Sequence, residues 1–171
     1  MSNDIIFGSG DDMSIDPLEP RIDVTQCVQS EVTRYAELEV AGRDFPLPVE
    51  EIRKLLREED QFSVKINLNY RLQGWCSFHA DEGNLVIDHL SILNEAYLPF
   101  IMQALFETIT YTPKASTIKN PLVTVLWPLH ETDRFVFQHL QAEGWKPNGV
   151  EPRHSFGYGS WWDSIKMQRQ F

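Results

Sequence analysis

The sequence predicts an α/β (α+β) fold with a mixed sheet and helices on both faces. Residues 62–69 alternate apolar and polar side chains, and this period of two is typical of a half-buried strand. Two further strand patterns follow after short turns, which indicates an antiparallel meander over 62–92. Helical and strand patterns then alternate from residue 97, an order that favours neighbouring parallel strands.

The first half is expected to contain a short strand and two helices before the meander. The expected elements are a strand around 22–24, helices over 26–38 and 48–59, and strands over 62–69, 72–79 and 85–92. The second helix is the clearer, because Pro48 suits a first helical turn and Glu50 and Glu51 complement its positive end. Residues 81–84 have the composition of a tight turn.

The second half is expected to hold two helices and three strands. The patterns predict a helix over 97–110, a strand over 122–127, a helix over 131–143 and strands around 154–160 and 163–170. Gly144 follows the second of these helices, where a glycine can adopt the left-handed conformation of a C-terminal cap.

Composition and charge indicate a single domain preceded by an acidic N-terminal tail. The chain has 171 residues and a net charge of −10, which disfavours nucleic acid and anionic membranes as partners. Residues 1–20 contain acidic side chains and no Lys or Arg, so they are expected to form a flexible tail before one domain over 21–171. No signal peptide or membrane span is evident, and Cys27 and Cys76 suggest no disulfide framework, so we expect a cytoplasmic protein.

Four stretches carry a resemblance to a known family. They are Leu72–Ser77 with its Gly74-Trp75 pair, Leu85–Ile92 running into a helix, Phe135–Trp145 ending in Gly144-Trp145, and Trp162–Met167. In this order they resemble the GNAT superfamily of acyl-CoA-dependent N-acyltransferases over residues 21–171. The resemblance implies a mostly antiparallel mixed sheet of about six to seven strands with helices on both faces. It also implies acetyl-CoA as cofactor and an amine as acceptor.

The resemblance fails where that family binds the CoA pyrophosphate. Its members use a turn of the form Arg/Gln-x-x-Gly-x-Gly/Ala, whose backbone N–H groups converge on phosphate at a helix N-terminus. Residues 93–101 contain no glycine, include Glu95 and Pro99, and lie in a stretch without Lys or Arg from 72 to 113. We therefore expect a degenerate site and no cofactor. If CoA binds at all, the resemblance assigns it to four residues: Ile92, Leu93, Tyr97 and Leu98.

Three residues are candidates for acid–base chemistry. The Tyr that often serves this family as general acid is missing from the helix before Gly144, where His139 could donate a proton instead. Asp88 and His89 lie on the fourth strand, where the family sometimes carries a general base. Neighbours on a strand point to opposite faces, so these two are not expected to share a site. Each could equally be a hydrogen-bonded strand residue.

Metal and hydrolase chemistry find little support in the sequence. His79, Asp81, Glu82, His89 and His130 show no spacing typical of a metal site, so no metal is expected. A tight turn would place His79 opposite about Val86 rather than His89. No Gly-x-Ser-x-Gly motif is present, so a Ser-His-Asp hydrolase is not predicted.

Aromatic residues gather near the C-terminus. Trp145, Tyr158, Trp161 and Trp162 could form a partner-binding surface, or they could cover the core. Two readings follow. The chain is a GNAT-like protein-interaction or structural module with a protein partner or a second copy of itself. Alternatively, it is an atypical acetyl-CoA-dependent N-acetyltransferase in which a main-chain N–H at a splay beside residues 91–93 stabilises the oxyanion.

Overall fold

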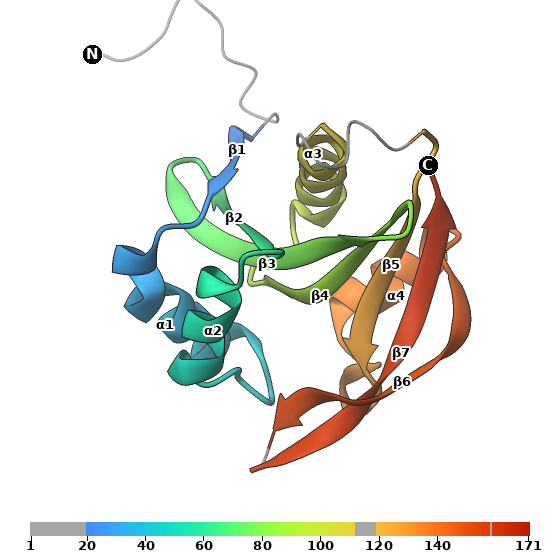
Figure 1. The fold of residues 1–171 in the computed structure, drawn as a ribbon. Coiled ribbons are helices and arrows are strands. Elements are labelled where there is room, and N and C mark those ends of the chain that lie inside the picture. The colour runs from blue at the N-terminus through green and yellow to red at the C-terminus, as the bar shows by residue number, and fades with distance from the viewer. Residues whose placement is uncertain (1–19, 112–118, 158) are drawn as a thin grey trace, which may run out of the picture.

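A seven-stranded sheet with helices on both faces makes up the protein, as seen in a computed structural model that describes residues 20–111, 119–157 and 159–171. The strand order is β1-β2-β3-β4-β5-β7-β6 (Figure 1). The strands are β1 (Ile22–Gln26), β2 (Phe62–Leu68), β3 (Arg71–Asp81), β4 (Asn84–Ile92), β5 (Leu122–Pro128), β6 (Lys146–Gly157) and β7 (Ser160–Gln170). The helices are α1 (Val32–Gly42), α2 (Val49–Arg57), α3 (Leu98–Thr110) and α4 (Phe135–Ala142), with short 3-10 helices η1 (Gln29–Glu31) and η2 (Leu129–Glu131).

The two central strands run parallel and then part. β4 pairs with β5 only over Asn84–Ile87 and Leu122–Val125, whereas every other neighbouring pair in the sheet is antiparallel. Beyond Ile87 and Val125 the two strands are no longer paired, and α3 makes the crossover between them. This leaves a gap in the sheet between the ends of β4 and β5.

Each face of the sheet has its own apolar cluster. The larger one lies under α3 and α4 and includes Ile101, Leu105 and Leu140, which are fully buried. The smaller one lies under α1 and α2 and is built around Ile52 and Trp75. This second face also carries polar residues of β3 and β4 that line a cavity. None of the helices among the described residues has the length and apolar character needed to span a membrane.

Most predicted elements are present, and three have clearly different bounds. The helix expected over 131–143 begins at Phe135, because Leu129–Glu131 form the separate 3-10 helix η2 and the backbone at Arg134 is extended. The helix expected over 26–38 begins later, because the backbone at Cys27 stays extended and its N–H donates to the Ser63 carbonyl (2.9 Å); α1 then runs on to Gly42. The strand expected around 154–160 starts at Lys146, since β6 is an exposed edge strand without an alternating pattern. Gly144 does close α4, with φ +88° and the Trp145 N–H bonded to the Leu140 carbonyl (3.0 Å).

A β-bulge in β4 overturns the prediction that Asp88 and His89 face opposite sides. His89 is opposite Ser77 and Ile87 is opposite Phe78, so Asp88 is an extra residue with no partner on β3. An extra residue breaks the alternation of side chains along a strand. Both Asp88 and His89 therefore line one cavity on the α1–α2 face.

A second irregularity reorients two residues of β6. Between the pairs Glu151–Ser164 and Ser155–Trp162, three residues of β6 stand opposite Asp163 alone. Arg153 there has φ +54°, which is uncommon for a residue other than glycine, and its N–H bonds to the Asp163 carboxylate (3.0 Å). As a result, the adjacent His154 and Ser155 both line the cavity that Asp88 faces.

Candidate functional site

A cavity of about 470 Å³ lies on the α1–α2 face, and we call it the aromatic cavity. It lies between α2, the polar face of β3 and β4, and the β6–β7 hairpin. Phe45, Phe156 and Trp161 are its aromatic wall, and Leu47 and Leu55 extend that wall. Its polar lining includes Gln61, His79, Asp88, His89, His154 and Ser155. A cavity with an apolar wall and a few convergent polar groups is the usual form of a small-molecule site.

Asp88 is the centre of the polar cluster in the aromatic cavity. Its Oδ2 accepts a hydrogen bond from Gln61 Nε2 (2.6 Å) and lies 2.6 Å from His79 Nδ1. Its Oδ1 lies 3.5 Å from His154 Nε2. Burial alone would raise the pKa of this carboxyl, but the contacts with His154, His79 and Gln61 outweigh it and lower the pKa to about 2. The hydrogen bond to Asp88 likewise raises the pKa of His79, against the opposing effect of burial.

His154 connects Asp88 to two serines. While Nε2 of its ring faces Asp88, Nδ1 lies 3.2 Å from Ser164 Oγ. Ser164 is fully buried, and its hydroxyl in turn bonds the hydroxyl of Ser155, which borders the aromatic cavity. A carboxylate, an imidazole and two hydroxyls thus form a continuous series that ends at the cavity.

His89 is engaged with a buried carboxylate. Glu39 of α1 is fully buried, and its oxygens lie 2.8 Å from His89 Nε2 and accept from Trp75 Nε1 (2.8 Å), from the Leu47 N–H (2.9 Å) and from the Ser91 hydroxyl. Burial would raise the pKa of Glu39, but His89, Arg43 and Ser91 lower it to about 2. This carboxylate therefore stays ionised and joins α1 to β3 and β4.

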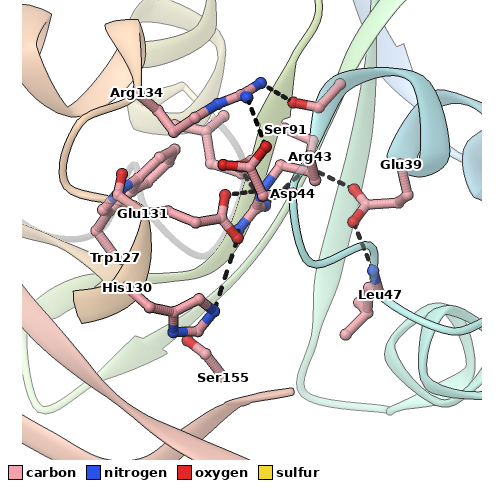
Figure 2. Close-up of polar contacts among 12 residues, drawn as sticks. Glu39, Arg43, Asp44, Leu47, Ser91, Trp127, His130, Glu131, Arg134 and Ser155 are labelled. Carbon is pink, nitrogen blue, oxygen red and sulfur yellow. Dashed lines mark hydrogen bonds and ion pairs between the residues drawn. The ribbon is translucent and has the colours of Figure 1, made fainter. Parts of the chain in front are cut away.

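Arg43 fills the gap between the ends of β4 and β5. Its guanidinium makes two parallel hydrogen bonds to Glu131, at 2.7 and 3.0 Å. It also donates to the Leu90 carbonyl (3.2 Å) and the Ser91 hydroxyl (3.0 Å) on β4, and it lies over the Trp127 ring of β5. Figure 2 shows Arg43 between the Glu39 and Glu131 carboxylates. Both partners of the Arg43–Glu131 pair are buried, with side-chain exposures of 5% and 0%.

Neighbouring polar contacts hold this pair in place. Arg134, just before α4, donates to the Gly42 carbonyl and to Asp44 (3.2 Å), so it fastens the segment that carries Arg43 (Figure 2). Trp127 Nε1 donates to the Glu131 carbonyl (2.7 Å). The gap is thus closed by side chains from three separate parts of the chain.

The start of α3 offers few free backbone donors. Asn94 Oδ1 accepts from the Ala96 N–H (2.8 Å), the Leu98 N–H bonds to the Glu95 carbonyl (3.2 Å), and Pro99 has no N–H. Ile92 and Leu98, two residues assigned to CoA, are core residues at 3% and 4% exposure. Leu93 is partly exposed, and Tyr97 packs against the core.

The remaining predicted residues are distributed over several places. His139 lies on α4 and faces a different groove, between α3 and α4, so the structure does not bring it together with Asp88 and His89. Trp145 is 3% exposed and packs on Phe106 and Phe171, so it is a core residue rather than a partner-binding one. Tyr158 lies outside the described residues. Within the described part of the chain, no cluster of His, Cys, Asp or Glu could hold a metal ion.

Trp161 and Trp162 are both 43% exposed and face opposite sides of the β6–β7 hairpin, as expected of strand neighbours. Trp161 packs edge-on against Phe156 in the wall of the aromatic cavity. Trp162 lies near His130, and its Nε1 donates to the Gly157 carbonyl (2.7 Å). The hairpin end therefore presents one large aromatic surface on each side.

Several of these residues were not selected by the sequence reasoning. Arg43 and Glu131 are 88 positions apart, and neither belongs to a motif. His154, Ser155 and Ser164 also went unnoticed, because only the β6 bulge brings them to one place. The pairing of β3 with β4 does place His79 opposite Val86, as expected. It nevertheless reaches Asp88, because the bulge turns Asp88 toward it.

The sheet order, the parting of β4 and β5 and the helices on both faces define the fold of the GNAT acetyltransferases. The ribosomal-protein-S18-alanine N-acetyltransferase of Escherichia coli superposes with a TM-score of 0.64 at 8% identity, over 88% of this chain and 94% of that one. NAA60 of Arabidopsis thaliana, in complex with a bisubstrate analogue, gives 0.63 at 11% identity over 88% and 98%. A spermidine N-acetyltransferase variant from Vibrio cholerae gives 0.59 at 11% over 87% and 93%. No protein-family model and no curated protein matches the sequence.

Proposed function

We propose that this GNAT-fold protein does not use acyl-CoA and acts as a protein-interaction module. The Arg43–Glu131 pair carries the proposal. The resemblance to the GNAT superfamily implies that an acetyltransferase would stabilise its oxyanion beside residues 91–93, in the splay where β4 parts from β5. Here the guanidinium of Arg43 contacts Leu90 and Ser91 in that splay, and it is buried together with Glu131. A thioester could enter only by displacing a buried ion pair, which costs several kcal/mol.

The start of α3 supports the same proposal. Phosphate binding at a helix N-terminus relies on free backbone N–H groups and is favoured by nearby positive charge. Two N–H groups there are already bonded, Pro99 lacks one, and Glu95 adds a negative charge. The pyrophosphate and thioester ends of the cofactor would thus both meet unsuitable surroundings. The alternative, an atypical N-acetyltransferase, would have to overcome both.

Ligand-induced thermal stabilisation tests the first part of this proposal. We expect acetyl-CoA, free CoA and a longer acyl-CoA to leave the melting temperature unchanged, with calorimetry as the second measurement. A ligand at 100 times its dissociation constant adds about 2.7 kcal/mol to stability, so millimolar cofactor would reveal even weak binding. A saturable shift with any of the three would contradict the proposal and revive the enzyme, with Asp88, His89 and His139 as the next residues to replace.

The contact surface of the module is the end of the β6–β7 hairpin. Trp161 and Trp162 are partly exposed there, and tryptophan is enriched among residues that dominate binding energy at protein interfaces. We expect Trp162→Ala to weaken association with a protein partner or a second copy, and Trp161→Ala to do the same. Sedimentation velocity over a range of concentrations measures self-association. Tyr111→Ala is the matched control, because Tyr111 is 79% exposed and follows α3 at another place in the fold. Unchanged association in both tryptophan variants would remove the hairpin from consideration.

A further inference from the structure

The series Asp88–His154–Ser164–Ser155 has the chemical order of an activated nucleophile. The carboxylate of Asp88 is ionised and faces Nε2 of His154 at 3.5 Å, so it favours the tautomer with the proton on Nε2. Nδ1 is then the acceptor for the Ser164 hydroxyl at 3.2 Å. Ser164 can in turn accept the hydrogen bond of the Ser155 hydroxyl. Each donor thus has an acceptor beside it, and the last hydroxyl borders the aromatic cavity.

We infer that Ser155 is a reactive serine that accepts an acyl group from an ester bound in the aromatic cavity. Two β-bulges assemble it, because regular strands would not turn both Asp88 and His154 toward one place. Bulges often stand beside active sites, where they redirect a side chain. This inference goes beyond the proposed function, since it concerns a serine of β6 in the cavity that Arg43 also borders and needs no acyl-CoA.

The step balances without any further reactant. The Ser155 oxygen attacks the ester carbonyl carbon, and its proton passes to Ser164 while the Ser164 proton passes to Nδ1 of His154. The ester C–O bond then breaks, and the departing alkoxide takes a proton back along the same series. Asp88 stabilises the transient imidazolium. Water then attacks the acylated Ser155 and releases a carboxylic acid by the same transfers in the reverse direction.

The cavity indicates which esters fit. Phe45, Phe156 and Trp161 provide apolar surface for the acyl or alcohol part. Arg153 lines the same cavity, and its guanidinium has no ion-pair partner in the part of the chain that the structure describes, so it is available to the developing oxyanion. The substrate class is therefore an uncharged ester with an aromatic or branched apolar group.

Labelling with a fluorophosphonate tests the inference on the full chain. The serine oxygen forms a P–O bond, fluoride leaves, and intact mass followed by peptide mapping locates the adduct. We expect one equivalent on Ser155, none on the Ser155→Ala variant, and unchanged labelling of Ser160→Ala, the matched control at an exposed serine of the same hairpin. Absence of an adduct on Ser155, or equal labelling of several serines, would overturn the inference.

Two further variants separate reactivity from folding. Ser164→Ala and His154→Gln should slow labelling at pH 7 at least tenfold while far-ultraviolet circular dichroism stays unchanged. His154 acts on Ser155 through Ser164, so it is a positioning residue. Its replacement should also change the dependence of the labelling rate on pH. Rates that keep the same pH profile in His154→Gln would show a merely structural role and contradict the proton route. Hydrolysis of p-nitrophenyl butyrate with an initial burst would confirm turnover.

Discussion

Two buried ionic residues, Glu39 and Arg43, hold together the buried hydrogen-bond network between α1 and the sheet. They are four positions apart at the end of α1 and point into the sheet beside Ser91. Each is buried with several partners, so its charge is retained inside the protein. Buried ion pairs often add little net stability, yet losing one partner leaves an uncompensated charge. The pair Arg43–Glu131 thus determines what the gap between β4 and β5 can accept.

Replacing Arg43 should therefore destabilise the protein strongly. We expect Arg43→Met to lower the free energy of unfolding by about 3–5 kcal/mol, because Glu131 would keep its buried charge without a partner. The double variant Arg43→Met/Glu131→Leu should recover part of this loss, because the unpaired charge of Glu131 is gone while Glu39 still lacks the neighbouring guanidinium. Urea denaturation of the wild type, the two single variants and the double variant measures the coupling. Equal stability of the single and double variants would show that the pair is not coupled.

The pKa of His79 leads to a prediction about pH. Asp88 raises the pKa of His79 above the usual 6.5, and Asp81 and Asp60 act in the same direction. The protonated ring therefore stabilises the folded state, fully below pH 6.5 and less as the pH rises through the folded-state pKa. We expect the urea midpoint of the protein to fall from pH 6 to pH 9 more steeply than that of His79→Gln. Parallel curves for the two proteins would contradict this assignment.

Bulges and edge strands are the elements that distinguish this fold from a regular sheet. The strand pattern of 62–92 was readable from the sequence because alternation reports burial on one face. The bulge at Asp88 was not, since Asp88 and His89 are two consecutive polar residues and nothing in the sequence marks either as the inserted one. The start of β6 was predicted at residue 154 instead of Lys146. Pro147, Gly149 and Pro152 are residue types that usually interrupt strands, so they gave no indication of this exposed edge strand. The site depends on these irregular places, which is why Asp88 and His89 on β4 are its only members predicted for acid–base chemistry, while Trp161 in its wall was predicted as a partner-binding residue.

The hairpin end packs against the loop before α2. Phe45 lies over Gly157, where an added Cβ would come within 2.8 Å of the phenylalanine ring. His130 packs edge-on against Phe45, with ring centroids 3.9 Å apart, and next to Trp162. Both ring nitrogens of His130 are buried and lack a hydrogen-bond partner among the described residues. Burial also lowers the pKa of His130, so the ring is neutral near pH 7.

Replacing His130 by an apolar ring should cost nothing. We expect His130→Phe to keep the stability or to raise it by about 1 kcal/mol, because an unsatisfied buried polar group is removed while the shape is kept. His79→Phe is the matched control and should be destabilising, since it leaves Asp88 with fewer donors. Thermal denaturation compares the two variants. A loss of stability in His130→Phe as large as in the control would reveal a hidden partner for the imidazole.

At the scale of the whole molecule, one sheet lies between two apolar clusters, and its strands contribute side chains to both. Strands β2, β3 and β4 contribute side chains to the larger cluster, while Trp75 on β3 belongs to the smaller one. Neither face can lose its helices without exposing the sheet to water. The two clusters should therefore unfold together.

Truncation of one buried side chain in each cluster tests whether the two clusters unfold together. Ile52→Ala under α2 and Leu105→Ala under α3 should each lower the free energy of unfolding by about 2–5 kcal/mol, because both side chains are fully buried. Tryptophan fluorescence and circular dichroism should still report one shared transition. Separate transitions in the Ile52→Ala protein would show that the α1–α2 layer unfolds on its own.

The closure of the gap by Arg43 and Glu131 also bears on how the chain could be redesigned. Under the proposed function, removing the pair would not restore cofactor affinity, because the start of α3 would still repel phosphate. Restoring glycines near Ala96 would not help either while Arg43 occupies the splay. Neither change alone would therefore create an acyl-CoA site, and both would be needed together. An attempt to engineer acyl-CoA binding into this chain would accordingly have to open the gap between β4 and β5 and rebuild the start of α3 in the same variant.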